Sequence, residues 1–174
     1  NKLVILVIGG SQGSVAVNDA VRGILPELLK KYQVIHLCGK GKLDSTKTDM
    51  EGYIQFEYVK KELADLFALA DVCISRAGAN AICELLALRK PNLLIPLSAN
   101  ASRGDQILNA ESFENQGFSE VLTEENLAPT MILPIIDKLY EKRADYVAAM
   151  EKSGQSDAIS KITSLIEEVT SGKN

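Results

Sequence analysis

The glycine-rich stretch VIGGSQGS, residues 7–14, is the first place where residue types and spacing suggest ligand binding. An apolar run ends here in glycines, and a helical pattern begins at once. A turn from a strand into a helix presents backbone N–H groups at the positive end of the helix dipole, which favours an anion such as a phosphate. Glycines also let a ligand approach the backbone closely. The candidate binding residues are Gly10, Ser11, Gln12 and Gly13.

Other interpretations of this loop stay open. The glycines are not followed by the Lys-Ser or Lys-Thr pair of a P-loop, and the dinucleotide spacing G-x-G-x-x-G fits only imperfectly. A tight turn with a purely structural role is the alternative.

A second run of small residues, SRAGANA at residues 75–81, also lies between an apolar strand-like segment and a helical pattern. In parallel α/β sheets ligands bind outside the carboxyl ends of the strands, so two helix N-termini are expected to face one crevice. The candidate binding residues of this run are Arg76, Gly78, Ala79, Asn80 and Ala81.

Glu84 lies one helical turn beyond Asn80, inside the segment NAICELLAL. A carboxylate near the crevice needs hydrogen-bond donors to offset its desolvation, and the diol of a ribose offers two. A glutamate on the solvent-facing side of a helix is the alternative.

A third polar stretch, RGDQILN at residues 103–109, opens another helical pattern. Asp105, Gln106 and Asn109 share one side of its first turn by i, i+3 and i+4 spacing. Carboxamides placed there can hydrogen-bond sugar hydroxyls, whereas helix capping and a solvated helix face are the alternatives.

The sequence contains no convincing general base or metal cluster. His36 is the single histidine and lies in the strand-like run VIHLC, where a hydrogen-bonded core position is expected. Without a second histidine there is no Ser-His-Asp triad with a visible partner and no His or Cys ligand spacing. The Asp49-Met50-Glu51 string lies in a polar loop, and its likeness to a metal-diphosphate clamp is attributed to chance. We therefore expect no catalytic residue, metal or cofactor in this chain.

The three cysteines, Cys38, Cys73 and Cys83, are odd in number and lack C-x-x-C spacing. Their apolar surroundings predict reduced core residues of a cytosolic protein.

Short apolar runs alternate with helical patterns along the chain. The expected strands are residues 3–8, 34–38, 53–59, 71–75, 92–97 and 118–122. Two helical stripes with i, i+3, i+4, i+7 spacing are Leu63, Leu66, Phe67 and Ala70, and Ala79, Ile82, Cys83 and Leu86. Strands that are apolar at successive positions are typical of sheets covered on both faces. The pattern predicts an α/β fold, a Rossmann-like, doubly wound parallel sheet of about six strands.

Segments 39–52 and 98–104 are predicted polar loops, and residues 126–174 are predicted to be all-helical. The last predicted helix has the apolar stripe Ile159, Ile162, Ile166 and Val169.

Length and charge restrict the classes of function. The 174 residues fit a single domain, 1–174, and no apolar run approaches the ~20 residues of a membrane span. A net charge of −4 argues against nucleic acid as a partner, because phosphate neutralisation needs a basic face. Since position 1 is Asn rather than Met and the first expected strand starts at about residue 3, we expect the chain to be part of a longer protein.

Four motifs occur in an order and spacing that resemble the carboxyl-terminal half of the MurG family, bacterial transferases of GlcNAc onto lipid-linked muramyl pentapeptide. They are GGSQG, CGKG, ADVCISRAGANAICELLAL and PNLLIPLSANASRGDQILNAESFENQG. The resemblance covers about residues 3–168. It implies one half of a two-domain GT-B glycosyltransferase, the half that holds the nucleotide-sugar donor UDP-GlcNAc.

The resemblance also implies roles for single residues. Ser11 and Gln12 are expected near the diphosphate and sugar, and the backbone of residues 79–81 near the phosphates. Glu84 is expected to bind the ribose hydroxyls, and Gln106, with Asn109 one turn beyond, the sugar hydroxyls. The uracil is expected against the loop at Val59, held through backbone groups.

The same resemblance places the acceptor site, the general base and the membrane-contacting patch in an amino-terminal half that is missing here. The whole enzyme is expected to be cytoplasmic, peripheral on the inner face of the plasma membrane, and to act in peptidoglycan synthesis, cell shape and cell division. This domain alone is expected to bind UDP-GlcNAc without metal and to be inactive. The alternatives are the donor half of another GT-B GlcNAc transferase or epimerase, or a Rossmann module that binds NAD.

Overall fold

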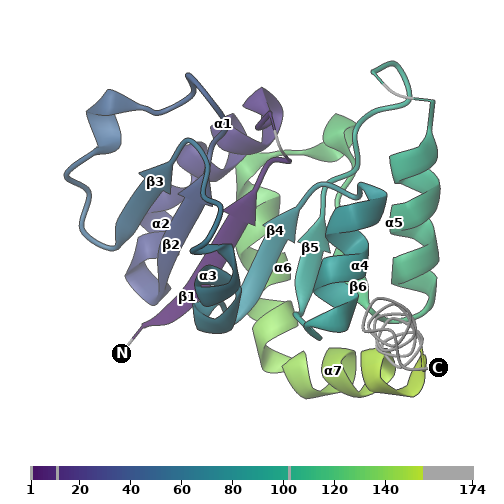
Figure 1. The fold of residues 1–174 in the computed structure, drawn as a ribbon. Helices are drawn as coiled ribbons and strands as arrows, with labels where there is room; N and C mark the ends of the chain where they lie inside the picture. The colour runs from purple at the N-terminus through teal and green to yellow at the C-terminus, as the bar shows by residue number, and fades with distance from the viewer. Residues whose placement is uncertain (1, 11, 102, 155–174) are drawn as a thin grey trace, which may run out of the picture.

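The computed structural model describes residues 2–10, 12–101 and 103–154. Strands and helices alternate along the chain (Figure 1). The strands are β1 Leu3–Ile8, β2 Tyr32–Leu37, β3 Tyr53–Phe56, β4 Val72–Ser75, β5 Asn92–Leu94 and β6 Ser119–Val121. The α-helices are α1 Val15–Gly23, α2 Leu25–Lys31, α3 Leu63–Leu69, α4 Ala79–Ala87, α5 Asp105–Asn115, α6 Pro129–Glu141 and α7 Arg143–Lys152, and the 3₁₀ turns are η1 Ser45–Lys47 and η2 Glu124–Asn126.

The strands form one parallel sheet of order β3-β2-β1-β4-β5-β6. This is the strand order of a doubly wound dinucleotide-binding fold, with the reversal of winding between β1 and β4. The predicted fold class, with about six strands, is confirmed.

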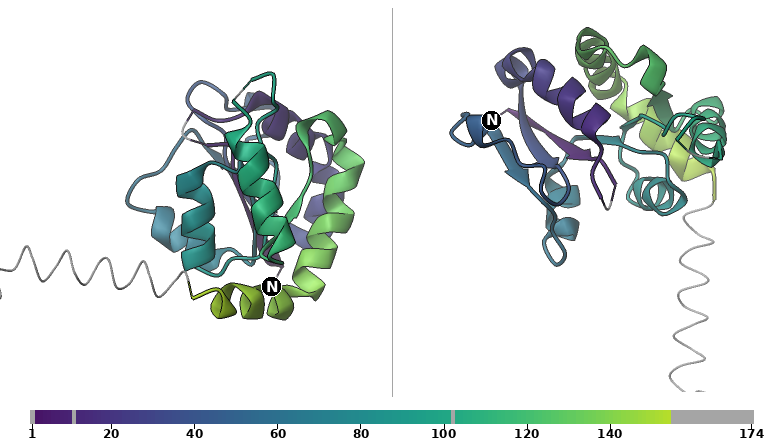
Figure 2. Two further views of the ribbon diagram at one scale, coloured as in Figure 1. Left: turned by 90° about the vertical axis from the view of Figure 1, so that its right-hand side faces the viewer. Right: turned by 90° about the horizontal axis from the view of Figure 1, so that it is seen from above.

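β1 lies at the centre of the sheet and shows why the sheet is buried on both faces. Its residues Ile5, Leu6 and Val7 are successive and fully buried. Ile5 pairs with Val34 of β2 on one side and with Val72 of β4 on the other. Helices α1, α2 and α6 cover one face, and α3, α4 and α5 cover the other (Figure 2). The continuous apolar runs of the sequence therefore correspond to strands between two helical layers, as predicted.

Two strands, β5 and β3, end three residues before the ends predicted from the sequence. β5 ends at Leu94, although Ile95 N still donates to Ser75 O at 2.8 Å. Pro96 follows and has no N–H to continue the ladder. β3 ends at Phe56, and Gly39 N makes one further ladder bond to Glu57 O at 2.9 Å. The segment 39–52 is a loop as expected, with the single turn η1 in it.

The helical stripe predicted for α4 is partly wrong. Its buried residues are Ile82, Leu85 and Leu86, whereas Ala79 and Cys83 are exposed. The larger Leu85 takes the inward position, which turns Cys83 toward solvent. Cys83 is therefore not a core cysteine, while Cys38 and Cys73 are buried as predicted; all of them are free thiols.

The chain after residue 126 forms α6 and α7 as far as residue 154, and the predicted stripe from Ile159 to Val169 lies outside the described residues. α7 lies at the end of the sheet away from the carboxyl ends of the strands (Figure 1). No helix in the described ranges is long and apolar enough to cross a membrane.

Candidate nucleotide-sugar site

The loop between β1 and α1 is a tight turn that leads directly into the helix. Gly10 has φ +89° and Gly13 φ +70°, and Gly13 N donates to Gly10 O at 3.0 Å. Ser14 caps α1, because its Oγ accepts a hydrogen bond from Val17 N at 3.3 Å. Ser11 lies outside the described residues.

The glycines of this loop serve internal packing as well as access. A Cβ on Gly13 would lie 1.9 Å from Cys38 O, and a Cβ on Gly39 would lie 2.4 Å from Gln12 O. The β1–α1 loop therefore touches the chain after β2 backbone to backbone. By contrast, a Cβ on Gly10 would meet nothing within 4 Å. Of these positions, only at Gly10 can room for a ligand explain the choice of glycine. Position 13 must be glycine because it contacts the backbone of the chain after β2.

The second predicted stretch brings the N-terminus of α4 to the same edge of the sheet. Gly78 is the N-cap of α4, and Ile82 N donates to Gly78 O at 3.1 Å. The N–H groups of Ala79, Asn80 and Ala81 belong to the first turn and have no partner within the helix. This turn therefore presents three amides at the positive end of a helix.

Arg76 is buried, with 7% of its surface exposed, and its guanidinium is bound by the protein itself. Nη1 donates to the carbonyls of Ile95 and Pro96, both at 3.1 Å. Nη2 donates to Ser14 Oγ at 2.6 Å and pairs with Glu124 Oε1 at 2.8 Å. Arg76 therefore joins the N-cap of α1, the end of β5 and the segment after β6.

Glu124 neutralises the charge of Arg76. Its other oxygen, Oε2, accepts a hydrogen bond from Ser98 N at 3.1 Å. Burial alone raises the pKa of this carboxyl, but the hydrogen bonds from Arg76 and Ser98 and the guanidinium charge outweigh it and hold the pKa below its ordinary value. At neutral pH the Glu124 carboxylate is therefore ionised and is the counter-ion of the Arg76 guanidinium.

The third predicted stretch contributes Gln106 near the start of α5. Gln106 Oε1 accepts a hydrogen bond from Leu97 N at 3.0 Å, and its Nε2 lies toward Gly78, 3.9 Å from the position of a Cβ there. Asn109 Nδ2 donates to Ala77 O at 3.0 Å. Both carboxamides thus link α5 to neighbouring loops, and the Nε2 hydrogens of Gln106 have no partner within the described ranges.

These loops enclose a cavity of about 1120 Å³ at the carboxyl end of the sheet. The predicted residues that line it are Gly10, Gln12, Gly13, Arg76, Gly78, Ala79, Asn80, Ala81 and Gln106. The first turns of α1 and α4 both face it, as expected for two helix N-termini at one crevice.

Four predicted residues do not line this cavity. Val59 is half-buried after β3 and packs against the core. Glu84 is exposed on α4, one turn beyond Asn80. Asp105 is exposed at the first position of α5, and Asn109 is held by Ala77 O. Their predicted contacts with the donor stay predictions.

The cavity also has lining residues that were not among the predicted binding residues. They are Gly9, Ser14, Val15, Ala16, Lys42, Leu97 and Glu124. Ser14 and Glu124 had a local signal, because one precedes a helical pattern and the other follows the last strand. Lys42 comes from a loop far along the chain, and nothing in its local sequence indicates that it reaches the cavity.

A buried polar network joins α1, β2 and β3 next to the start of the loop that carries Lys42. Asn18 Nδ2 donates to Cys38 O at 2.9 Å, so Asn18 Oδ1 must accept from His36 Nε2, also at 2.9 Å. His36 Nδ1 then accepts from the Tyr53 hydroxyl at 2.9 Å. Burial and the nearby Arg22 charge lower the pKa of His36 to about 3, so the ring is neutral. The prediction of a hydrogen-bonded core histidine is confirmed.

Within the described part of the chain, no group of three or more His, Cys, Asp or Glu side chains is placed to hold a metal ion. Asp49 and Glu51 are both exposed in the loop before β3.

The match to known families agrees with this geometry. The model of the glycosyltransferase family 28 C-terminal domain matches residues 4–169. The chain belongs to this family. One curated relative, from Lachnospira eligens, is 62% identical over 168 residues, which are 97% of this chain and 48% of the relative. Another, from Lachnoclostridium phytofermentans, is 60% identical over 95% of this chain and 47% of the relative.

Both relatives are named UDP-N-acetylglucosamine--N-acetylmuramyl-(pentapeptide) pyrophosphoryl-undecaprenol N-acetylglucosamine transferase. The family 28 chain described here spans about half the length of these relatives.

Solved structures share the fold of this family 28 domain. The crystal structure of Acinetobacter baumannii MurG superposes with a TM-score of 0.72 at 20% identity, over 93% of this chain and 49% of that one. The glycosyltransferase VinC, solved in complex with dTDP, superposes with a TM-score of 0.66 at 17% identity, over 99% of this chain and 42% of that one. The fold is that of the carboxyl-terminal half of a GT-B glycosyltransferase.

Proposed function

We propose that this chain is the UDP-GlcNAc-binding half of an inverting glycosyltransferase that adds GlcNAc to lipid-linked muramyl pentapeptide in peptidoglycan synthesis. The relatives at 62% and 60% identity carry the name of this activity, which gives the substrate class. The observation that carries the proposal to this chain is the single cavity onto which the first turns of α1 and α4 both open. Two helix N-termini at one cavity suit a ligand with two adjacent negative phosphates.

In the proposed reaction a hydroxyl of the acceptor sugar attacks the anomeric carbon of GlcNAc. The bond from that carbon to the diphosphate oxygen breaks, UDP leaves with the bonding electrons, and the hydroxyl proton passes to a base outside this chain. Negative charge therefore grows on the diphosphate.

The protein groups suited to this charge are fixed amides. Gly13 N already donates to Gly10 O, so the amides of Val15 and Ala16 on α1 are the better candidates beside those of Ala79–Ala81 on α4. Amides held by helices stabilise developing charge without reorganising, which is the electrostatic form of catalysis. The proposal needs no metal and no cofactor.

Gln106 and Glu84 are proposed recognition residues. The Nε2 hydrogens of Gln106, which have no partner among the described residues, suit a sugar hydroxyl, because its Oε1 is fixed by Leu97 N. Glu84, exposed beyond the cavity rim on α4, suits the two hydroxyls of a ribose that extends along the helix. Replacing Glu84 by Ala is then expected to weaken UDP binding by roughly 1.5–3 kcal/mol, the scale of hydrogen bonds to a charged group. Glu114→Ala, an exposed glutamate on α5, is the matched control.

The other half of the enzyme is proposed to supply what this chain lacks. The relatives are about twice as long, and that additional length is proposed to hold the acceptor site, the general base and the contact with the inner face of the plasma membrane. The uracil is proposed to lie against the backbone at Val59. This domain alone is expected to bind donor and to transfer nothing.

An NAD-binding module is the competing class, because the strand order also suits a dinucleotide. Such sites usually place an acidic residue at the end of the second strand for the ribose. Here β2 ends at Leu37 and is followed by Cys38 and Gly39, which cannot fill that role.

Calorimetric titration with UDP-GlcNAc, UDP, UDP-glucose and NAD in metal-free buffer tests the proposal. We expect UDP ligands to bind, with UDP-GlcNAc preferred to UDP-glucose. Binding of NAD with no response to the uridine ligands would assign the site to the dinucleotide class instead. Transfer of GlcNAc to a lipid acceptor by this chain alone would contradict the proposed division of labour.

A further inference from the structure

The cations that line the cavity differ in whether their charge is already compensated. Arg76 forms an ion pair with Glu124 at 2.8 Å, and its other Nη hydrogens are donated to the carbonyls of Ile95 and Pro96 and to Ser14 Oγ. Lys42 is the other cation in the lining, and it has no ion pair among the described residues. A diphosphate in this cavity would therefore meet one neutralised and one available positive charge.

The position of the Lys42 ammonium is defined by the glycine loop. Its Nζ donates to Gln12 O at 2.6 Å and to Gly13 O at 3.1 Å. An ammonium carries three hydrogens, so one remains for a ligand oxygen. Because Lys42 also lines the cavity, that hydrogen is available at its wall.

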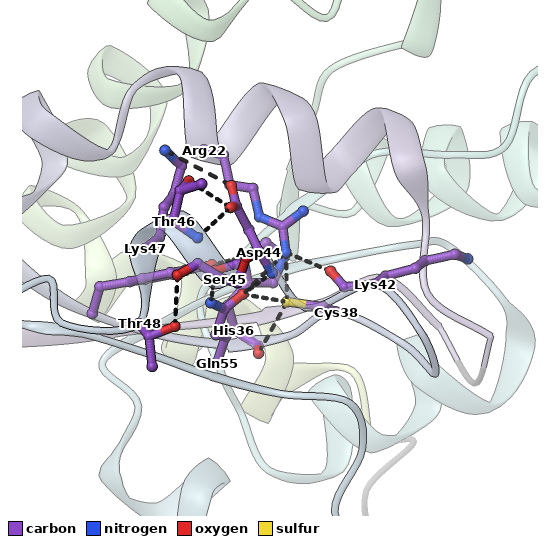
Figure 3. Close-up of polar contacts among 11 residues, drawn as sticks. Arg22, His36, Cys38, Lys42, Asp44, Ser45, Thr46, Lys47, Thr48 and Gln55 are labelled. Carbon is purple, nitrogen blue, oxygen red and sulfur yellow. Dashed lines mark hydrogen bonds and ion pairs between the residues drawn. The ribbon is translucent and has the colours of Figure 1, made fainter.

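The backbone of Lys42 is anchored from behind. Arg22 Nη2 donates to Lys42 O at 2.6 Å and to Gln55 Oε1 at 3.1 Å, and Lys42 N donates to Gly39 O at 3.1 Å. In Figure 3 the Arg22 guanidinium meets the carbonyl of Lys42, and the lysine side chain extends away from the Arg22 cluster. The loop is thus held on one side while its ammonium reaches the glycine loop.

The acidic residue closest to Lys42 in the sequence of this loop has hydrogen-bond partners of its own. Asp44, which lines a smaller cavity of about 330 Å³ beside Lys42, accepts from Thr46 N and Oγ1 and lies 3.8 Å from Lys47 Nζ. Asp44 therefore leaves the Lys42 charge available for a ligand.

We infer that Lys42 binds the diphosphate of the donor, joining the carbonyls of the glycine loop to a phosphate oxygen through one ammonium. The inference rests on the proposed function, since it names a residue for the same site. It makes the β2–β3 loop, far from the two glycine-rich motifs in sequence, the third wall of the phosphate site.

The test compares Lys42→Met and Lys42→Arg with the unmodified 174-residue chain, using calorimetry with UDP and with UMP. Lys40→Met is the matched control, because Lys40 is exposed in the same loop and lines neither of these two cavities. We expect Lys42→Met to lower UDP affinity about tenfold or more, the scale of a charge-assisted hydrogen bond, and Lys42→Arg to restore most of it. UMP, with one phosphate, should lose less, and added salt should weaken UDP binding less in Lys42→Met than in the unmodified chain.

Thermal melting of each variant separates binding from folding. A loss of equal size for UDP and UMP, matched by a lower melting temperature, would show that Lys42 only braces the glycine loop and would overturn the inference. Unchanged UDP affinity in Lys42→Met, or an equal loss in Lys40→Met, would overturn it as well while leaving the proposed function intact. If the unmodified chain bound no uridine ligand, both the inference and the proposed function would fail.

Discussion

The backbone contact between the glycine loop and the chain after β2 gives a sharp prediction for Gly13→Ala. The added Cβ would lie 1.9 Å from Cys38 O and 2.7 Å from Gly39 Cα, whereas real Cβ contacts stay above 3.0 Å. The two loops must therefore separate by about 1 Å, and both contacted atoms are backbone, which cannot rotate away. Overpacking of this kind costs about 1–3 kcal/mol, and we expect the upper end, about 3 kcal/mol.

Gly41→Ala separates this steric cost from the cost of the backbone conformation. Gly41 has the same φ of +70°, but a Cβ there meets nothing within 4 Å. Both variants bear a left-handed penalty of roughly 1–2 kcal/mol, offset in part by a stiffer unfolded chain. Urea unfolding should show Gly13→Ala to be less stable than Gly41→Ala by about 3 kcal/mol. Equal stability of the two variants would refute the reasoning.

Three further predictions concern titration, the partly buried Arg76–Glu124 ion pair and thiol exposure. The pKa of His36 is lowered to about 3 in the folded protein, so below about pH 6.5 only the unfolded chain binds a proton at this residue. The free energy of unfolding should therefore fall by about 2 kcal/mol between pH 7.5 and pH 5. Urea titrations of His36→Gln at both pH values should lack this component of the pH dependence. Arg76→Met should cost about 3 kcal/mol by leaving Glu124 unpaired, and adding Glu124→Gln should cost less than the sum of the single changes. Cys83 alone should react with a thiol reagent in the folded protein, and the buried Cys73 only on unfolding; early reaction of a second thiol would contradict the burial.

The parts of the fold and site that the sequence predicted are those set by local pattern. Continuous apolar runs identified the six strands of the described residues, and the small residues after β1 and β4 identified the two helix N-termini that meet at the cavity. Glycine and helix-start signals act over a few residues, so a single sequence contains them.

The parts that the sequence missed depend on contacts between distant segments. Lys42 lies at the cavity in a loop whose Gly39 packs on Gln12 O and whose ammonium donates to that same carbonyl, a contact between segments about 30 residues apart. Arg76 lines the cavity, but its compensation by Glu124, 48 residues away, follows from the folded chain alone. Cys83 was wrongly predicted to be buried because two sides of α4 carry apolar residues. In the folded protein the buried side is the one that contains Leu85.

The measurement that most directly tests the central claim is an amide NMR titration of this chain with UDP-GlcNAc. If the cavity between α1 and α4 is the donor site, the shifts of Val15, Ala16 and residues 79–81 should change together and saturate in parallel. Saturable shifts confined to other parts of the chain would contradict the account. The absence of any shift at UDP-GlcNAc concentrations that saturate the donor sites of related transferases would contradict it as well.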